Sequence, residues 1–378
     1  MRVPLIKPDL PTLDEVAEPF REILGSGRIT NFGKYVTAFE EEAATYLGAP
    51  AVTVSSGTLG LLFALQTMGL RPGQKVVVPS FTFMATSQAI LYASGVPVFA
   101  EVGHDLTLCP EDLAALLDQH EDVAGVLATH AYGLPCRVDE IQAILDVYAH
   151  RRSRPVFVVY DAAHAFGSAV NGRRVGQFGD AEVFSLSVTK LLVSVEGGMV
   201  SSRSPAVIDR IRQMRNYGIE NNYDARWPGM NGKMSEFHAV IGLHNLRRLD
   251  ALVDTRQKKA RYFLDRIRKE TAFETLAWPD AVIHTFKDFT VLVPESMSHM
   301  RDDAMAFART RGVETRAYFY PPVHEQRLFR GFAGRPLPRT EGIARRVITL
   351  PFYTAITEEE MDYVVETLRL AQERWTRT

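Results

Sequence analysis

The 378-residue sequence predicts an α/β fold: a large domain with a mostly parallel central sheet flanked by helices, then a smaller C-terminal α+β domain. Three observations predict it. Short apolar runs alternate with helical stretches, as in repeated strand–helix units. The runs are apolar throughout, as expected of strands that are buried on both faces. A long helical pattern from about residue 235 then leads to a second region with strands and helices of its own.

Two helices are expected first, over residues 12–24 and 35–47, the second with Val36, Phe39 and Ala43 on one side. The strand–helix series follows. Its expected strands cover residues 51–54, 75–78, 96–99, 123–128, 156–160, 182–186 and 199–202. Expected helices cover residues 59–68 and 82–94 between these strands and residues 205–215 after the last of them.

The second region begins with a helix that carries Leu246, Leu249 and Leu252 at helical spacing. Strands are expected near residues 289–293 and 347–350, and helices near 301–311 and 357–373. We expect a large domain over residues 1–250 and a small domain over 251–378. The basic stretch over 256–261 alternates with apolar residues, which favours a solvated helix face.

Composition excludes several classes of protein. The formal charge of −2 gives no overall attraction to nucleic acid or to an anionic membrane. No apolar run approaches the roughly 20 residues that span a bilayer, and the N-terminus lacks a signal-peptide pattern. Cys109 and Cys136 are too few for a disulfide framework, and no zinc-ligand spacing occurs, so we expect a cytoplasmic protein without a metal.

Lys190 is the residue on which the functional interpretation depends. It follows the apolar run that ends at Ser185, and Asp161 and His164 follow the preceding run. Pyridoxal phosphate requires a lysine that forms a Schiff base with its aldehyde and a carboxylate that keeps its ring nitrogen protonated. A lysine that is partly desolvated also loses its proton more easily, which the bond requires. The set therefore indicates an enzyme that uses this cofactor.

The loop Ser55-Ser56-Gly57-Thr58 lies between an expected strand and an expected helix. Small residues at a helix N-terminus suit a phosphate, although for this loop taken alone ordinary helix capping by Ser or Thr is the favoured explanation. Phe83 follows the next strand and could stack on a pyridine ring or pack in the core. Asp161 could cap a turn instead, and His164 could be satisfied by local hydrogen bonds. The combination with Lys190 favours cofactor binding.

Two other enzymatic interpretations are weaker. Ser187 and Lys190 match an SxxK pattern, with Ser187 as an acylated nucleophile, but the companion motifs of such hydrolases are absent. The glycine-containing segment 25–30 lacks the third glycine of a dinucleotide fingerprint and follows a helix rather than a strand. A non-enzymatic regulatory protein on the same scaffold would not need the complete lysine, carboxylate and phosphate set.

Taken together, these motifs resemble the sugar aminotransferases of the DegT/DnrJ/EryC1/StrS family. The resemblance covers nearly the whole chain and extends to Glu196-Gly197-Gly198-Met199, the segment 231–236 and the segment 320–324. It implies fold type I, as in aspartate aminotransferase. One departure is that the family often has glycine where this chain has Val195. Another is the segment 186–189, which differs from the common aromatic-containing version.

The resemblance implies a role for each matching residue. Lys190 would hold the cofactor and then carry the proton between substrate and cofactor. Asp161 would pair with the ring nitrogen, and His164 and Phe83 would lie against the ring. The phosphate would be held by Gly57, Thr58, Ser185 and, from the neighbouring subunit of a homodimer, Asn231. Tyr320 and His324 would lie near the substrate.

The implied reaction is an amino transfer in two halves. L-glutamate would convert the cofactor to pyridoxamine phosphate, and the amine would then pass to a keto sugar that is most simply nucleotide-linked. A cyclitol or another keto acceptor is the alternative substrate. Sugar dehydratases of the family have histidine in place of the lysine, and Lys190 argues against that activity.

Overall fold

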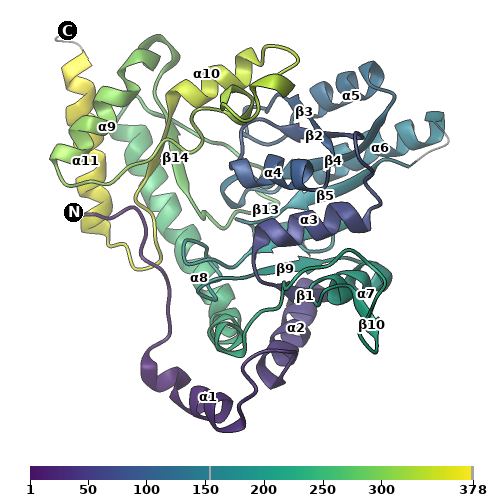
Figure 1. The fold of residues 1–378 in the computed structure, drawn as a ribbon. Coiled ribbons are helices and arrows are strands. Elements are labelled where there is room, and N and C mark those ends of the chain that lie inside the picture. The colour runs from purple at the N-terminus through teal and green to yellow at the C-terminus, as the bar shows by residue number, and fades with distance from the viewer. Residues whose placement is uncertain (153–154, 376–378) are drawn as a thin grey trace.

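A seven-stranded sheet forms the centre of the computed structural model, which describes residues 1–152 and 155–375 (Figure 1). The strand order is β1-β9-β8-β5-β4-β2-β3, and β9 alone of these runs antiparallel to its neighbours. The bounds are β1 Ala51–Val54, β2 Lys75–Pro79, β3 Val96–Ala100, β4 Val123–Thr129, β5 Phe157–Asp161, β8 Ala181–Ser185 and β9 Gly198–Ser201. The prediction of a mostly parallel sheet in an α/β fold is confirmed.

Both faces of this sheet are covered by helices, because successive side chains of a strand point to opposite faces. Val76 and Val78 of β2 belong to one hydrophobic cluster with the helices α3, α4 and α7, whereas Val77 belongs to another with α2, α5, α6 and α8. This explains why the strands are apolar throughout. The helices are α2 Lys34–Leu47, α3 Gly57–Thr67, α4 Met84–Tyr92, α5 Pro110–Gln119, α6 Val138–Arg152, α7 Pro205–Met214 and α8 Glu236–Glu270.

The C-terminal region has a separate core. Its three-stranded antiparallel sheet, in the order β12-β14-β15, packs with α9, α11 and the second half of α8 around Phe263, Phe289 and Phe352. The elements are β12 Glu274–Thr275, β14 Phe289–Leu292, α9 Arg301–Thr310, α10 Pro338–Arg346, β15 Val347–Leu350 and α11 Glu358–Trp375.

The remaining elements are short or peripheral. α1, Leu13–Ser26, lies against α8, and β13 pairs with β6, which pairs with β7. The strands of these two pairs are β6 Ala169–Val170, β7 Arg173–Arg174 and β13 Val282–Ile283, and a hairpin is formed by β10 Ile219–Asn221 and β11 Asp224–Ala225. Four short 3-10 turns cover Ala131–Gly133, Glu295–Met300, Val323–Glu325 and Arg330–Phe332.

Helix α8 joins the two regions. Figure 1 shows it running from beside α2 to the neighbourhood of α11. The boundary that we place near residue 250 falls inside this helix, and the division into domains stays a prediction. Among the described residues, no helix is both long and apolar enough to cross a membrane.

The expectation that the basic stretch of α8 forms a solvated face is confirmed at two residues and wrong at Arg256. Within the basic stretch over 256–261, Lys258 and Arg261 are exposed, but Arg256 is 4% exposed. Its guanidinium group donates hydrogen bonds to the carbonyl oxygens of Thr285, Phe286, Lys287 and Phe352. Arginine can be buried here because backbone carbonyls replace the water around its N–H groups. The local pattern of charges did not reveal these distant partners.

Candidate active site

A cavity of about 390 Å³ lies at the carboxyl ends of the parallel strands. Successive strands of a parallel sheet end at the same edge, so the residues that follow them converge there. Five segments from this edge line the cavity: residues 56–58 after β1, 82–83 after β2, 129–130 at the end of β4, 161–164 at the end of β5, and 185–190 after β8. The second region adds Lys287, Asp288, Tyr318 and Phe319.

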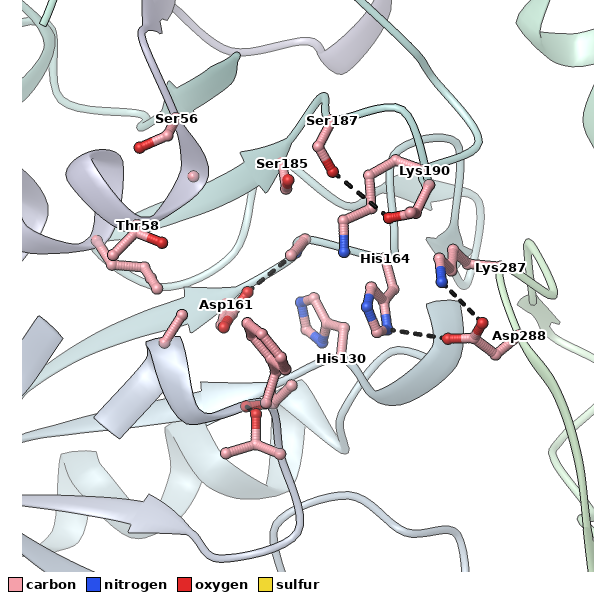
Figure 2. A pocket seen from close by; sticks show the side chains of 18 of the residues that line it. Ser56, Thr58, His130, Asp161, His164, Ser185, Ser187, Lys190, Lys287 and Asp288 are labelled. Atoms are coloured by element: carbon pink, nitrogen blue, oxygen red, sulfur yellow. Dashed lines mark hydrogen bonds and ion pairs between the residues drawn. The ribbon is translucent and has the colours of Figure 1, made fainter. Parts of the chain in front are cut away.

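Lys190 extends into this cavity, as Figure 2 shows. Burial, which removes water from its ammonium group, and the nearby charge of Lys287 together lower the pKa of Lys190 to about 8, against the opposing effect of the carboxylates around it. A larger fraction of this amine is therefore neutral near pH 7 than of an ordinary lysine. The side chain has the property that a nucleophilic lysine needs.

Asp161 is 6% exposed and forms the end of β5. Its Oδ2 accepts a hydrogen bond from the Thr86 hydroxyl at 2.7 Å, and its Oδ1 accepts one from the backbone N–H of Ala163 at 3.1 Å. Burial raises the pKa of this carboxyl group, while the two hydrogen bonds oppose the rise. A cationic ligand beside Asp161 would stabilise its charged form.

His164 lies between Lys190 and the second region (Figure 2). Burial lowers the pKa of His164 well below its ordinary value, and the charges of Lys190 and Lys287 act in the same direction, so the imidazole is neutral. Its Nδ1 is buried without a hydrogen-bond partner among the described residues and lies 3.9 Å from Oδ2 of Asp288. Its ring stacks at 6.4 Å, centroid to centroid, on Phe319.

The N-terminus of α3 faces the same cavity. Ser56 caps the helix, with its hydroxyl accepting a hydrogen bond from the N–H of Leu59 at 3.2 Å. Gly57 is packed against the end of β8: a Cβ placed on it would lie 3.1 Å from Cβ and 3.2 Å from Cα of Ser185. Glycine thus allows the helix end to approach Ser185 closely, and the free N–H groups there form a site for an anion.

His130 forms part of the cavity wall and was not predicted. The N–H of Cys136 donates to its Nδ1 at 2.9 Å, so the proton lies on Nε2, which is 2.9 Å from Oε1 of buried Glu182. The ring stacks on Tyr160 at 4.9 Å between centroids. These contacts fix the imidazole beside the end of β5. Its only sequence signal is that it follows an apolar strand.

Most of the predicted site residues come together in this cavity. Lys190 shares it with six others: Gly57, Thr58, Phe83, Asp161, His164 and Ser185. Phe83 is 52% exposed in the single chain. Three predicted residues are not among those that line it. Asn231 is exposed, Tyr320 stacks with Arg301 at 4.2 Å, and buried His324 lies 2.6 Å from the Ser80 hydroxyl through Nδ1. Their functional roles stay predictions.

Besides His130, sequence reasoning missed Lys287 and Asp288, the charged residues that the second region adds to the cavity. They immediately precede the apolar strand β14, and two adjacent opposite charges before a buried strand were the available signal. The hydrolase interpretation gains no support from the geometry. The Ser187 hydroxyl lies 3.4 Å from that of Thr189, and within the described residues it has no hydrogen bond to Lys190.

The chain is similar in sequence to known proteins over nearly its whole length. Residues 12–369 match the model of the DegT/DnrJ/EryC1/StrS aminotransferase family. The chain is 28% identical to the GDP-perosamine synthase of Vibrio cholerae over 95% of this chain and 97% of that protein. It is 32% identical to the erythromycin biosynthesis sensory transduction protein EryC1 of Saccharopolyspora erythraea, over 94% of each.

A solved structure extends the comparison to three dimensions. The crystal structure of DesI in the presence of its TDP-sugar product superposes with a TM-score of 0.90 and 32% sequence identity. The match covers 99% of this chain and 95% of that one. The similarity therefore includes both the large sheet and the C-terminal region, and not only the strand–helix series.

Proposed function

The chain belongs to the DegT/DnrJ/EryC1/StrS aminotransferase family, and we propose that it uses pyridoxal phosphate to move an amino group from L-glutamate to a nucleotide-linked keto sugar. One observation carries the proposal: the amine of Lys190 and the buried carboxylate of Asp161 face one cavity, beside the N-terminus of α3. When bound, pyridoxal phosphate supplies an electrophilic aldehyde and a protonated ring that withdraws electrons from the reacting carbon.

The residues present fit this cofactor. Because Gly57 has no side chain, the N-terminus of α3 lies close to Ser185, and its backbone N–H groups can bind a phosphate in the cavity. The hydroxyl groups of Thr58 and Ser185 line the cavity at the same place. Asp161 would face the ring nitrogen, because a buried carboxylate needs a cationic partner to stay charged. His164 and Phe83 supply flat surfaces for the ring.

Lys190 has two tasks in this proposal. Its lowered pKa makes the neutral amine available to bond the aldehyde. Once an incoming amine displaces it, Nζ is free to accept a proton from the substrate carbon and to return it elsewhere. Tyr318 and Phe319 line the cavity on the side of the second region and add aromatic surface beside the reacting atoms.

The acceptor is inferred from relatives. The Vibrio cholerae relative is named for a GDP-linked sugar, and the DesI structure is described as being in the presence of its TDP-sugar product. A nucleotide-linked keto sugar is therefore the acceptor that we propose.

We also propose that the enzyme is a homodimer with shared sites. Asn231 is exposed and does not line the cavity of its own chain, which suits a residue that reaches the phosphate in the partner subunit. Mixing subunits that carry Lys190→Ala with subunits that carry Asn231→Asp should restore activity, because some mixed dimers contain one intact site. Absence of restoration in verified mixed dimers would contradict sharing.

The visible absorption spectrum tests the central proposal. Wild type with pyridoxal phosphate should develop a yellow band from the lysine-bound cofactor, and L-glutamate should bleach it. Lys190→Ala should form no such band. A wild-type protein that stays colourless with added cofactor would contradict the proposal and favour a regulatory role. A band that bleaches with glutamate directs the search to keto-sugar acceptors, tested by product mass.

A further inference from the structure

Lys287 and Asp288 bring charge into the cavity from outside the large sheet. Both line it, and their side chains are only 5% and 3% exposed. Lys287 Nζ donates a hydrogen bond to Oδ1 of Asp288 at 2.7 Å (Figure 2). A buried ion pair contributes little to stability by itself, because desolvation of the two charges offsets their attraction. The stability of the fold therefore does not account for the pair.

The backbone at this pair is firmly held. The N–H of Lys287 donates to the carbonyl of Tyr132 at 2.9 Å, and its carbonyl accepts from the buried Arg256 guanidinium at 3.2 Å. Arg256 also binds the carbonyls of Thr285 and Phe286. The two side chains thus enter the cavity from a fixed position, as a binding group requires.

The pair has hydrogen-bonding capacity to spare. An ammonium group can donate three hydrogen bonds, and Asp288 takes the one that Nζ makes within the described part of the chain. Oδ2 of Asp288 and Nδ1 of His164 are both buried without a hydrogen-bond partner there. Buried polar atoms are normally satisfied, so the two spare N–H donors of Lys287 indicate a ligand with acceptor atoms, while Oδ2 of Asp288 can pair only with an N–H or O–H group of that ligand.

Charge identifies the kind of ligand. Among the described residues that line the cavity, the lysines are Lys190 and Lys287, and none is an arginine. In the proposed function the Lys190 amine is committed to the cofactor. A dicarboxylic amino acid enters with two carboxylates, and Lys287 is the cation that this chain offers to either of them.

We propose that Lys287 binds a carboxylate of the amino donor and that Asp288 is the positioning residue that holds it. The proposal rests on the function proposed above. Asp288 fixes Nζ through one hydrogen bond and leaves the remaining two donors for the carboxylate. It also keeps the subsite neutral overall, so that an uncharged sugar ring can occupy the same space in the second half-reaction.

The test compares glutamate with an amine that has no carboxylate. The rate at which each bleaches the yellow band is measured against its concentration, for wild type and Lys287→Met. We expect the variant to need about 10- to 100-fold more glutamate for half the maximal rate, as for a lost charged hydrogen bond. The response to a simple primary alkylamine should change much less. This ratio separates carboxylate binding from any effect of Lys287 on the reactivity of Lys190.

Two further variants serve as controls. Lys75→Met removes the ammonium from a Lys–Asp pair with Asp122 at 3.1 Å that does not line the cavity, and it should behave as wild type. Lys287→Arg keeps the charge and should recover part of the affinity for glutamate. The strength of the yellow band reports whether each variant binds the cofactor, which a merely structural role of Lys287 would alter.

The outcomes separate this inference from the proposed function. If wild type bleaches with glutamate and Lys287→Met has the same concentration dependence, the inference alone is overturned. If glutamate and the alkylamine weaken equally, Lys287 does not recognise the carboxylate, and the inference is also overturned. If wild type forms no band or does not respond to glutamate, the proposed function is wrong and the inference is overturned with it.

Discussion

Positive charge is buried at the cavity, by Lys190 and Lys287, and also at Arg256 of α8. The two places differ in how many hydrogen bonds the surrounding residues provide. Arg256 is surrounded by backbone carbonyls that accept its hydrogen bonds. Lys190 has no hydrogen bond from its ammonium group within the described residues, and its neighbours Asp288 and His164 keep unpartnered atoms. At Arg256, backbone carbonyls take up several hydrogen bonds of the charge and hold two regions of the chain together, whereas the charges at the cavity keep unused hydrogen-bonding capacity, which suits a ligand.

The largest effect expected from this comparison is on activity at Asp161. Asp161→Asn keeps the shape of the side chain but removes the charge that would stabilise a protonated ring. We expect amino transfer to fall by about 10²- to 10³-fold, in the range of a lost electrostatic contact in an active site. Steady-state kinetics at saturating cofactor measures this fall.

The same variant should leave stability nearly unchanged. Burial opposes the Asp161 charge, so its removal costs the fold little. Urea unfolding of the cofactor-free protein checks this expectation. A large loss of stability with a modest loss of activity would show that Asp161 stabilises the fold, as we expect Arg256 to do, and would contradict its role in binding a ligand.

The next effect is on stability at Arg256. Arg256→Met would leave several buried carbonyl oxygens without donors, and we expect the free energy of unfolding to fall by about 3 kcal/mol. Urea denaturation measures it. Lys258→Met, on the exposed face of the same helix, is the matched control and should change stability by less than about 0.5 kcal/mol. Equal effects for both would show that the carbonyl contacts do not stabilise the fold.

The pH dependence of the reaction with the cofactor tests whether burial makes Lys190 reactive near neutral pH. The neutral amine is the reactive form of Lys190, so the rate of bonding to pyridoxal phosphate should rise about tenfold per pH unit below the pKa and level off above pH 8. An ordinary lysine would continue to gain reactivity up to about pH 10.4. Stopped-flow absorbance of the cofactor-free enzyme records the profile. A midpoint near 10 would show that burial does not tune this amine.

The smallest effect concerns the loop after Lys190. Val195 has φ of 69°, in the left-handed region that β-branched residues avoid, where the family often has glycine. Val195→Gly should therefore raise the free energy of unfolding by about 1 kcal/mol. Val188→Gly, at a partly exposed position nearby without positive φ, should lower it by about 0.5 kcal/mol or more. Thermal unfolding of both variants measures these changes. A Val195→Gly variant that is less stable than wild type would show that the backbone at Val195 is not strained.

Some elements of the fold could be predicted from the sequence and others could not. The strands of the large sheet were predictable because each is a continuous apolar run that is buried on both faces. Helices α5 and α6 and the short strands β6, β7 and β13 were missed. The short strands have only two residues each, and so few residues carry no periodic signal.

The sequence by itself determined the chemistry that follows the parallel strands. Asp161 and Lys190 each come after an apolar run, and parallel strands that end at one edge must bring such residues together. Only the tertiary structure decided what meets them from elsewhere. Lys287 and Asp288 lie about a hundred residues further along the chain, and the packing of the second region against the sheet edge sets their position. Arg256 was misjudged for the same reason: its partners are backbone carbonyls that no local pattern reveals.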